Sequence, residues 1–433
     1  GNKSGGLIGT AGGDASISDS WADGNVNGTK NVGGLIGKVE SQQGAEIVGS
    51  SHATGDINGT KKVGGLIGFN NDSDSTIENL SATGNVRGKS KVGGLIGQHR
   101  GGDIIQSAAS GDIYVTSSEG YQLGGLIGLI GYNTHINVTQ SSATGNITGG
   151  DDVGGLIGDY YYKGNVTDSY ASGTVTGESG IGGLIGASTT NVISSNTTAN
   201  VSGNDDVGGL IGETSGNIRN SAFDGNISGE SNIGGIVGDT DGNIINTHAS
   251  ADISGKKDVG GLAGENWGNI RNSNASGDVQ ATTDVGGDPL DQLDQTPGVG
   301  GLVGDNRGNI SQSHAIGDIT GTDNVGGLAG RNEGGNISNS YATGNVTGKN
   351  DVGGLIGKHK VGNVTNTYAT GDVDGSMEVG GLIGKSEAAD LGIDISSAQV
   401  IDTYATGKVN GSSQVGGLIG NNDAAPGLPS YES

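Results

Sequence analysis

A short glycine-rich motif recurs along the whole chain and restricts what the chain can fold into. The motif Gly-Gly-apolar-x-Gly, most often VGGLIG, occurs fifteen times, with its first glycine at Gly5 in the first copy and at Gly416 in the last. Neighbouring copies stand 26 to 40 residues apart, and a broken copy at Val285–Gly287 has its first glycine 26 residues after Gly260. The unit is therefore 26 residues long, with insertions in some copies. A fixed period of this length is typical of stacked repeat architectures.

The residues within one unit favour short strands over helices. Apolar residues show no helical period, and between Ala342 and Gly348 the side chains alternate between two faces, as in a β-strand. Ile337 is out of phase with Ala342, which predicts a corner near Asn339-Ser340. We expect residues 326–330 (GGLAG) to form a further short strand, which gives about three short strands per coil.

Stacking of identical coils in register predicts an all-β fold, a parallel β-solenoid (β-helix). We expect about 15 right-handed coils of 26–31 residues around a column of Val, Ile, Leu and Ala. The solenoid should cover residues 1–420, with insertions at 288–298 and 385–397 and a C-terminal tail at 421–433. Leu355 and Ile356 are adjacent apolar residues, so the chain either bends and buries both, which we favour, or presents an apolar stripe for lateral packing. One asparagine register should form an amide ladder along the axis: Asn191, Asn217, Asn243, Asn269 and Asn309.

Composition excludes several classes of protein. Glycine accounts for 93 of 433 residues and aromatics for 3%, so the apolar core must be narrow. Four prolines and the lack of a three-residue glycine period exclude collagen. A net charge of −25 disfavours binding to nucleic acid or anionic lipid. The absence of cysteine excludes disulfides, thiol catalysis and cysteine-type zinc sites, and no apolar run is long enough to span a membrane.

The motif VGGLIG, repeated beside Gly-Asn-Ile/Val and Tyr-Ala-Thr-Gly, resembles the GLUG-motif repeats over residues 1 to about 420. Such repeats occur in large surface proteins of bacteria and archaea, including adhesins and the stalks of some secreted immunoglobulin-A peptidases. The resemblance implies extracellular display and a role in adhesion or scaffolding, and it brings no catalytic residues. Members usually carry a signal and an anchor or further domains. Because residue 1 falls inside a repeat unit, we expect this chain to be a piece of a longer protein.

Acidic residues recur at one register and are candidate metal ligands. The column lies five residues after the first motif glycine and consists of Glu213, Asp239, Glu265 and Asp305. A second, interrupted column lies just before the motif valine: Asp152, Asp206, Asp258 and Asp351. Stacked carboxylates repel one another unless a cation or salt screens them, and calcium prefers such oxygen ligands. Calcium is therefore a candidate ligand, although no cofactor is required, and a solvated acidic face is the alternative.

Aromatic residues are candidate contacts for a ligand. Tyr160, Tyr161 and Tyr162 lie at an insertion, and insertions at one register collect on one edge of a solenoid. Tyr341 and Tyr368 share a register with Tyr404, so they either stack on one another or bind sugar rings.

Asn-x-Ser/Thr sequons are candidate glycosylation sites on an extracellular chain. They include Asn137, Asn146, Asn165, Asn226, Asn336, Asn345 and Asn363.

These features together predict a non-enzymatic extracellular protein at the cell surface, an adhesin stalk or scaffold. Its partners would be other copies of itself, or cell-surface or matrix components including glycans, with no nucleic acid and no membrane insertion. A self-assembling subunit of an extracellular filament is the second hypothesis. A carbohydrate-active β-helix enzyme is the third, and it would need a pair of carboxylates outside the repeated columns.

Overall fold

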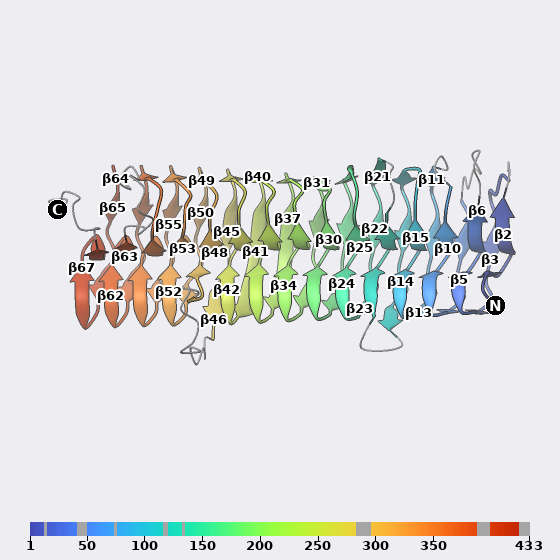
Figure 1. Ribbon diagram of the computed structural model, residues 1–433, viewed down its shortest axis with the longest axis horizontal. Helices are drawn as coiled ribbons and strands as arrows, with labels where there is room; N and C mark the ends of the chain where they lie inside the picture. The colour runs from blue at the N-terminus through green and yellow to red at the C-terminus, as the bar shows by residue number, and fades with distance from the viewer. Residues whose placement is uncertain are drawn as a thin grey trace, which may run out of the picture. The chain divides into compact units, whose positions relative to one another are not determined.

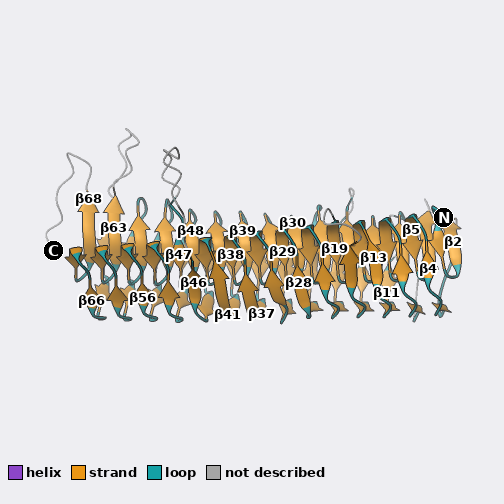
Figure 2. Ribbon diagram, turned by 90° about the horizontal axis from the view of Figure 1, so that it is seen from below, coloured by secondary structure: helices purple, strands orange, loops and turns teal. Residues whose placement is uncertain are grey.

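The computed structural model describes residues 1–12, 15–40, 50–72, 76–115, 120–131, 135–282, 296–387 and 399–423. Every regular element in these ranges is a β-strand, as Figure 2 shows, and no helix there is long and apolar enough to cross a membrane. The chain divides into two compact units, Gly1–Asn226 and Ile227–Ser433. The expected insertion residues 288–295 and 388–397, and residues 424–433 of the expected tail, lie outside the described residues.

Each unit is a parallel β-solenoid, which confirms the predicted fold class (Figure 1). The first and second sheets each contain one strand per coil and 15 strands among the described residues, in agreement with the number of coils expected. Each strand pairs in parallel with the equivalent strand of the neighbouring coil. Most coils contain five short strands in four sheets rather than the three strands expected.

The coil around residue 330 shows why the strand count differs. Its strands are β52 (Asp323–Gly326), β53 (Ala329–Asn332), β54 (Ile337–Ser338), β55 (Tyr341–Ala342) and β56 (Val346–Thr347). The motif is thus a bend between two strands and not a strand of its own. The bend turns two adjacent apolar side chains inward, and Leu355 and Ile356 are both fully buried, as predicted.

In the first unit, each strand of the first sheet ends at the motif Val-Gly or its equivalent. These strands are β1 (Ser4–Gly5), β5 (Lys30–Gly33), β9 (Lys61–Gly64), β14 (Ser90–Gly93), β19 (Tyr121–Gly124), β24 (Asp151–Gly154), β29 (Ser179–Gly182) and β34 (Asp205–Gly208). The second sheet begins at the motif isoleucine: β2 (Ile8–Gly12), β6 (Ile36–Glu40), β10 (Ile67–Asn70), β15 (Ile96–His99), β20 (Ile127–Ile130), β25 (Ile157–Tyr160), β30 (Ile185–Ser188) and β35 (Ile211–Thr214). The third sheet contains β11 (Ile77–Glu78), β16 (Ile104–Ile105), β21 (Ile136–Thr139), β26 (Gly164–Thr167), β31 (Asn191–Ile193) and β36 (Ile218–Arg219).

In the second unit, the first sheet contains β38 (Ser231–Gly234), β42 (Lys257–Gly260), β47 (Val299–Gly300), β52, β57 (Asn350–Gly353), β62 (Met377–Gly380) and β67 (Ser413–Gly416). The second sheet contains β39 (Val237–Thr240), β43 (Ala263–Asn266), β48 (Val303–Asn306), β53, β58 (Ile356–His359), β63 (Ile383–Glu387) and β68 (Ile419–Asp423). The third sheet contains β40 (Ile244–Ile245), β44 (Ile270–Arg271), β49 (Ile310–Ser311), β54, β59 (Val364–Thr365) and β64 (Val400–Ile401).

The fourth sheet contributes two short strands to most coils. Those of the first unit are β3 (Trp21–Ala22), β4 (Val26–Asn27), β7 (His52–Ala53), β8 (Ile57–Asn58), β12 (Ser81–Ala82), β13 (Val86–Gly88), β17 (Ala108–Ala109), β18 (Ile113–Val115), β22 (Ser142–Ala143), β23 (Ile147–Thr148), β27 (Tyr170–Ala171), β28 (Thr174–Thr176), β32 (Asn196–Thr197) and β33 (Asn200–Ser202). Those of the second unit are β41 (His248–Gly255), β45 (Asn274–Ser276), β46 (Val279–Ala281), β50 (His314–Ala315), β51 (Ile319–Thr320), β55, β56, β60 (Tyr368–Ala369), β61 (Val373–Asp374), β65 (Tyr404–Ala405) and β66 (Val409–Asn410), while β37 (Ala222–Ser228) crosses the division between the units.

The core is a narrow column, as the scarcity of aromatic residues predicted. Val325, Leu328 and Ile337 are completely buried, and Ala342 is 1% exposed. Across the column, a Cβ on Gly327 would lie 2.8 Å from the Cβ of Ala342 and 2.1 Å from a backbone oxygen of the next coil. Close approach of backbones therefore requires glycine at this motif position.

The predicted corner between the third and fourth sheets is confirmed. Asn339 has a φ of 50°, which asparagine tolerates better than most residues. The hydroxyl of the buried Ser340 donates to the carbonyl of Ser338 at 2.8 Å and accepts the backbone N–H of Ser313 at 3.1 Å. These bonds satisfy polar groups at the corner and repeat from coil to coil.

The predicted asparagine ladder is present within each unit. In the first unit, Nδ2 of Asn217 donates to Oδ1 of Asn191 at 3.0 Å. In the second, Nδ2 of Asn269 donates to Asn243 at 2.8 Å, and Asn309 donates to Asn269 at the same distance. These amide hydrogen bonds connect neighbouring coils on the outside of the fold.

Candidate functional site

Asp305, the most buried charged side chain that the structure describes in the second unit, lies beside the glycine bend. The first and second sheets meet there at very short range, because a Cβ on Gly330 would lie 2.2 Å from the backbone nitrogen of Val299 in the preceding coil. Side chains just before the motif valine can therefore reach side chains at the third position of the second-sheet strands. We call these two sets of positions the bend strip.

Three of the four predicted metal ligands are brought together in the bend strip of the second unit. Asp239 pairs in register with Glu265, and Glu265 pairs with Asp305. Glu213 holds the equivalent position in the first unit, next to Ala187. The acid column predicted from the sequence is thus correct as a register within the second unit.

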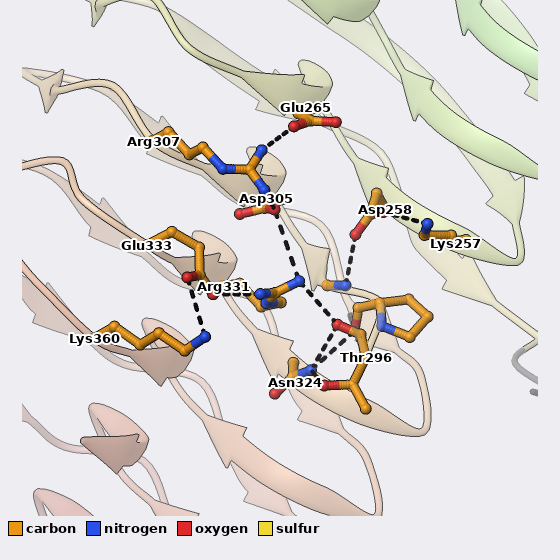
Figure 3. A network of polar contacts seen from close by, with 12 residues as sticks. Lys257, Asp258, Glu265, Thr296, Asp305, Arg307, Asn324, Arg331, Glu333 and Lys360 are labelled. Atoms are coloured by element: carbon orange, nitrogen blue, oxygen red, sulfur yellow. Dashed lines mark hydrogen bonds and ion pairs between the residues drawn. The ribbon is translucent and has the colours of Figure 1, made fainter. Parts of the chain in front are cut away.

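Two arginine side chains contact the carboxylates of this column (Figure 3). The sequence analysis did not predict them. Arg307 contacts the carboxylate of Glu265, and its Nη2 lies 2.9 Å from Oδ2 of Asp305. Arg331 is the next residue in the same column, and its Nη1 lies 3.7 Å from Oδ2 of Asp305. The register that identified the acids would also have identified Arg331, whereas Arg307 lies two residues further along its coil.

Asp305 is the most constrained member of the column. It is 3% exposed, and burial raises its pKa to about 7, although Arg331 acts in the opposite direction. Arg331 also contacts Glu333, whose other oxygen lies 3.1 Å from Nζ of Lys360. The charges therefore alternate through a network of ion pairs.

The second predicted acid column is also buried in part. Asp258 accepts the backbone N–H of Gly298 at 2.9 Å, and burial raises its pKa. Asp351 neighbours Glu378, and burial together with that glutamate raises the pKa of Asp351 to about 8. Nζ of Lys385 lies 3.6 Å from Oε1 of Glu378. In the first unit, burial and nearby acids raise the pKa of Asp152 to about 7, and Asp206 holds the equivalent position two coils later.

The part of the chain that the structure describes offers no coordination geometry for the predicted calcium. Among the described residues, no three acidic or histidine side chains converge as metal ligands would. Around Glu265 and Asp305, guanidinium groups supply the positive charge that a cation would bring. Calcium binding at the acid column stays a prediction.

The aromatic register in the second unit forms a continuous stack. The ring centroids of Tyr341 and Tyr368 are 4.8 Å apart with planes 3° from parallel, and those of Tyr368 and Tyr404 are 5.1 Å apart. His314 extends the stack, with its centroid 4.6 Å from that of Tyr341. Ring faces within the stack are turned toward one another, which favours the predicted mutual stacking. A sugar ring needs a free face, so Tyr341 and Tyr368 would present only their edges to it.

The tyrosine triplet does not behave as one surface. Tyr160 is fully buried, pairs in register with Ile130 and Ser188, and donates its hydroxyl to the carbonyl of Ile136. The prediction that Tyr160 contacts a ligand is therefore wrong, because this residue belongs to a repeated inward column. Tyr161 is 66% exposed and packs edge-on to Tyr162, so only these two can contact a ligand.

That inward column carries a second polar ladder that the sequence did not suggest. Nδ2 of Asn266 donates to Asn306 at 2.8 Å, and Asn306 donates to Asn332 at 2.7 Å. Asn332 meets Nδ1 of His359 at 3.1 Å. Burial lowers the pKa of His359 to about 4, so this histidine is neutral near pH 7. The residue six positions after the first motif glycine could have identified the column.

The predicted sequons also belong to ladders. Asn137 and Asn165 are half-buried, and Nδ2 of Asn165 donates to Asn137 at 3.2 Å. Asn336 donates in the same way to Asn309, while the side-chain oxygen of Asn363 accepts a backbone N–H. Three others lie in a second outward column and also form hydrogen bonds between coils: Asn146, Asn226 and Asn345. A glycan on Nδ2 would compete with the contacts that this atom makes in Asn146, Asn165, Asn226 and Asn336. Asn345 donates through its backbone N–H and Asn363 accepts through its side-chain oxygen, and glycosylation stays a prediction.

Comparison with known protein families finds one family model that matches parts of the chain. The model of the GLUG motif matches residues 59–87, 149–176, 257–280 and 321–347, which are two segments in each unit. Each match begins near a first-sheet strand and ends near the second strand of the fourth sheet, so it covers about one coil. No curated protein and no solved structure matches the chain.

Proposed function

This chain carries GLUG-motif repeats on a β-solenoid, and from that premise we propose that it is a non-enzymatic extracellular protein of the cell surface, which serves as a stalk or scaffold for attachment. GLUG repeats are typical of secreted or surface proteins. Its partners would be matrix or cell-surface components, glycans among them, or further copies of itself.

The observation that carries the proposal is the continuity of side-chain columns from coil to coil. Asparagine amides, buried serines and tyrosine rings each continue through successive coils by direct contact. Such columns stabilise a stack whose outer surface repeats. A repeated surface suits a scaffold, whereas catalysis needs a unique convergence of groups.

The buried carboxylates support a structural role in the same way. Asp305 and Asp351 both belong to repeated columns, and each faces a basic side chain, Arg331 or Lys385. The pair formed by Asp351 and Glu378 is therefore part of the strip and not an isolated pair of the kind that a glycosidase requires.

Antibodies raised against the folded chain test the proposal. On intact cells that produce the protein, immunogold labelling should decorate the outer surface. Fab fragments of the same antibodies should reduce the number of cells that attach to a matrix-coated slide, while fragments from pre-immune serum should not. Labelling that needs permeabilised cells would contradict the surface location. Surface labelling without any effect of the Fab fragments would contradict the attachment role.

A further inference from the structure

The first unit carries a surface on which charge changes sign along the coils. Three columns form it: the first residue of each first-sheet strand, the residue that follows it, and the third residue of each second-sheet strand. We call these columns the charge strip. Coil by coil, they contain Lys30, Asn31 and Lys38; Lys61, Lys62 and Phe69; Ser90, Lys91 and Gln98; Tyr121, Gln122 and Leu129; Asp151, Asp152 and Asp159; Ser179, Gly180 and Ala187; and Asp205, Asp206 and Glu213.

The three columns form one continuous surface because their side chains touch. Nζ of Lys62 lies 3.5 Å from the centroid of the Phe69 ring, which joins the first and second sheets in one coil. Nε2 of Gln122 donates to Oδ2 of Asp159 at 2.7 Å, which joins them between coils. A molecule bound to this face would therefore interact electrostatically with all three columns.

In the basic half of the strip, Lys38 pairs with Glu40, whereas the four lysines of the first-sheet columns form no ion pair with the residues that the structure describes. These four lysines are Lys30, Lys61, Lys62 and Lys91. Burial and four neighbouring cations, Arg100 first among them, lower the pKa of Lys62 to about 7. A chain with a net charge of −25 thus gathers positive charge here without compensating it.

The second unit shows that the fold can pair such lysines. Lys358 and Lys385 occupy the same position of their second-sheet strands as Lys38 and Phe69. Lys358 lies 3.0 Å and Lys385 lies 2.6 Å from carboxylate oxygens of Glu387. Lys38 pairs in the same way with Glu40, so the lysines of the first unit that lack an ion pair among the described residues are those of its first-sheet columns.

The acidic half of the strip carries an excess of carboxyl groups over basic groups. Burial and nearby acids raise the pKa of Asp152 to about 7. Burial raises the pKa of Asp159 to about 6, although Gln122 and Lys91 act in the opposite direction. Asp151 and Asp205 point to solvent at the first column. The neutral coil that contains Tyr121 separates the basic half from the acidic half.

We propose that the charge strip binds the same strip of a second copy of this chain, with the two copies antiparallel. A two-fold axis at the coil of Tyr121 would place each basic coil opposite a coil that is acidic or neutral. The coil of Lys30 would face that of Asp205, and the coil of Lys91 would face that of Asp151. Such an interface is isologous, so each copy contributes both halves. Seven coils span about 30 Å along the strip.

The alternation of charge selects this partner over two others. Parallel copies in register would place like charges opposite one another. A long polyanion lying along the strip would meet Asp152 two coils, or about 10 Å, beyond Lys91, and would be repelled there. The net charge of the chain opposes association only weakly at 0.1 M salt, where charges more than about 10 Å apart are largely screened.

Charge reversal on the full chain tests the proposal by sedimentation velocity. One variant carries Lys30→Glu and Lys91→Glu, and the other carries Asp151→Lys and Asp205→Lys. Lys30, Asp151 and Asp205 are exposed and Lys91 is partly exposed, so both variants should fold, which circular dichroism checks. The control, Lys163→Glu with Lys349→Glu, changes net charge as the first variant does, but at exposed positions outside the strip.

We expect the wild type and the control to dimerise at micromolar concentration in 0.1 M NaCl, with at least tenfold weaker association in about 1 M NaCl. Each reversed variant alone should be monomeric, because its two contacts become like-charged. An equimolar mixture of the two variants should form dimers again, because every contact then joins opposite charges. A misfolded variant could not produce that rescue.

Three results would overturn the proposal. The wild type could stay monomeric at 0.1 M NaCl; the reversed variants could dimerise as the wild type does; or their mixture could remain monomeric. Heparin serves as a probe for an external polyanion. If heparin binds a monomeric wild type, and Lys30→Glu with Lys91→Glu abolishes that binding, the strip serves such a ligand and the proposed dimer is wrong.

Discussion

A single methyl group at the second motif glycine should open the solenoid locally. In Gly354→Ala, the new Cβ would lie 2.1 Å from the carbonyl oxygen of Gly381 and 2.9 Å from the Cβ of Ala369. Relief requires the two coils to separate by about 1 Å, which stretches bonds such as that from the N–H of Leu355 to the next coil, now 2.8 Å. Overpacking costs about 1–3 kcal/mol and each lost hydrogen bond about 1 kcal/mol, so we expect a local loss of about 4 kcal/mol.

The last described coil supplies a matched control at the same motif position. A Cβ on Gly417 would meet nothing within 4 Å among the described residues. Gly417→Ala should therefore change stability by less than about 1 kcal/mol, and a small gain is expected from the reduced freedom of the unfolded chain.

Hydrogen exchange measures the local cost directly, without assuming that the solenoid unfolds in one step. A loss of about 4 kcal/mol should accelerate exchange of the amides around Leu355 by roughly a thousandfold in Gly354→Ala. Amides around Gly417→Ala should exchange as in the wild type. Equal protection in the two variants would refute the argument that close backbone approach is what requires glycine.

Three further predictions follow from the polar columns. The pKa of Asp351 is raised to about 8 from a usual value near 4, so between these pH values the folded state holds a proton that the unfolded state releases. The free energy of unfolding therefore falls as pH rises between those values. Asp351→Asn should flatten the fall in melting temperature from pH 6 to pH 9, whereas Asp374→Asn, at an exposed position, should not. Arg307→Gln removes a guanidinium from the carboxylate of Asp305 and should lower the melting temperature; millimolar calcium should restore part of the loss if the column can bind the ion, and the lack of any calcium effect at moderate salt would exclude that site. Asn269→Ala breaks one amide contact on each side and should cost about 1–2 kcal/mol in chemical denaturation, while an unchanged midpoint would show that the ladder adds no stability.

The sequence predicts the fold well because each coil repeats the same requirements. The period of the glycine motif predicts that coils stack along one axis. The alternation of side chains around Ala342 predicts the strands of the fourth sheet, and the change of phase between Ile337 and Ala342 predicts the corner at Asn339. The strand count was wrong because the motif contains its own bend. Strands of two residues are too short for an alternating pattern to separate them from the corners that join them.

The candidate site was predicted less completely, since one-dimensional registers find neighbours along the axis and not across the bend. The acids of the second unit stack as expected, but Arg307 reaches them from outside their column. Tyr160 was assigned to a surface because it adjoins two other tyrosines, although its own register points inward. Contacts between sheets depend on the side on which each residue leaves the bend, and the pattern of residue types does not specify that side.

A fold made of near-identical coils limits where recognition can be encoded. Core positions such as Val325 and Leu328 recur almost unchanged, because each coil must match the coils beside it. The outer columns beside the bend are free of that requirement, and there the residue changes from lysine at Lys61 to aspartate at Asp151 along one register. Specificity in such a chain should therefore depend on the order of charges along a column rather than on any one residue. It follows that moving a charge by one coil, at constant composition, should alter partner binding more than replacing a charge by a neutral residue.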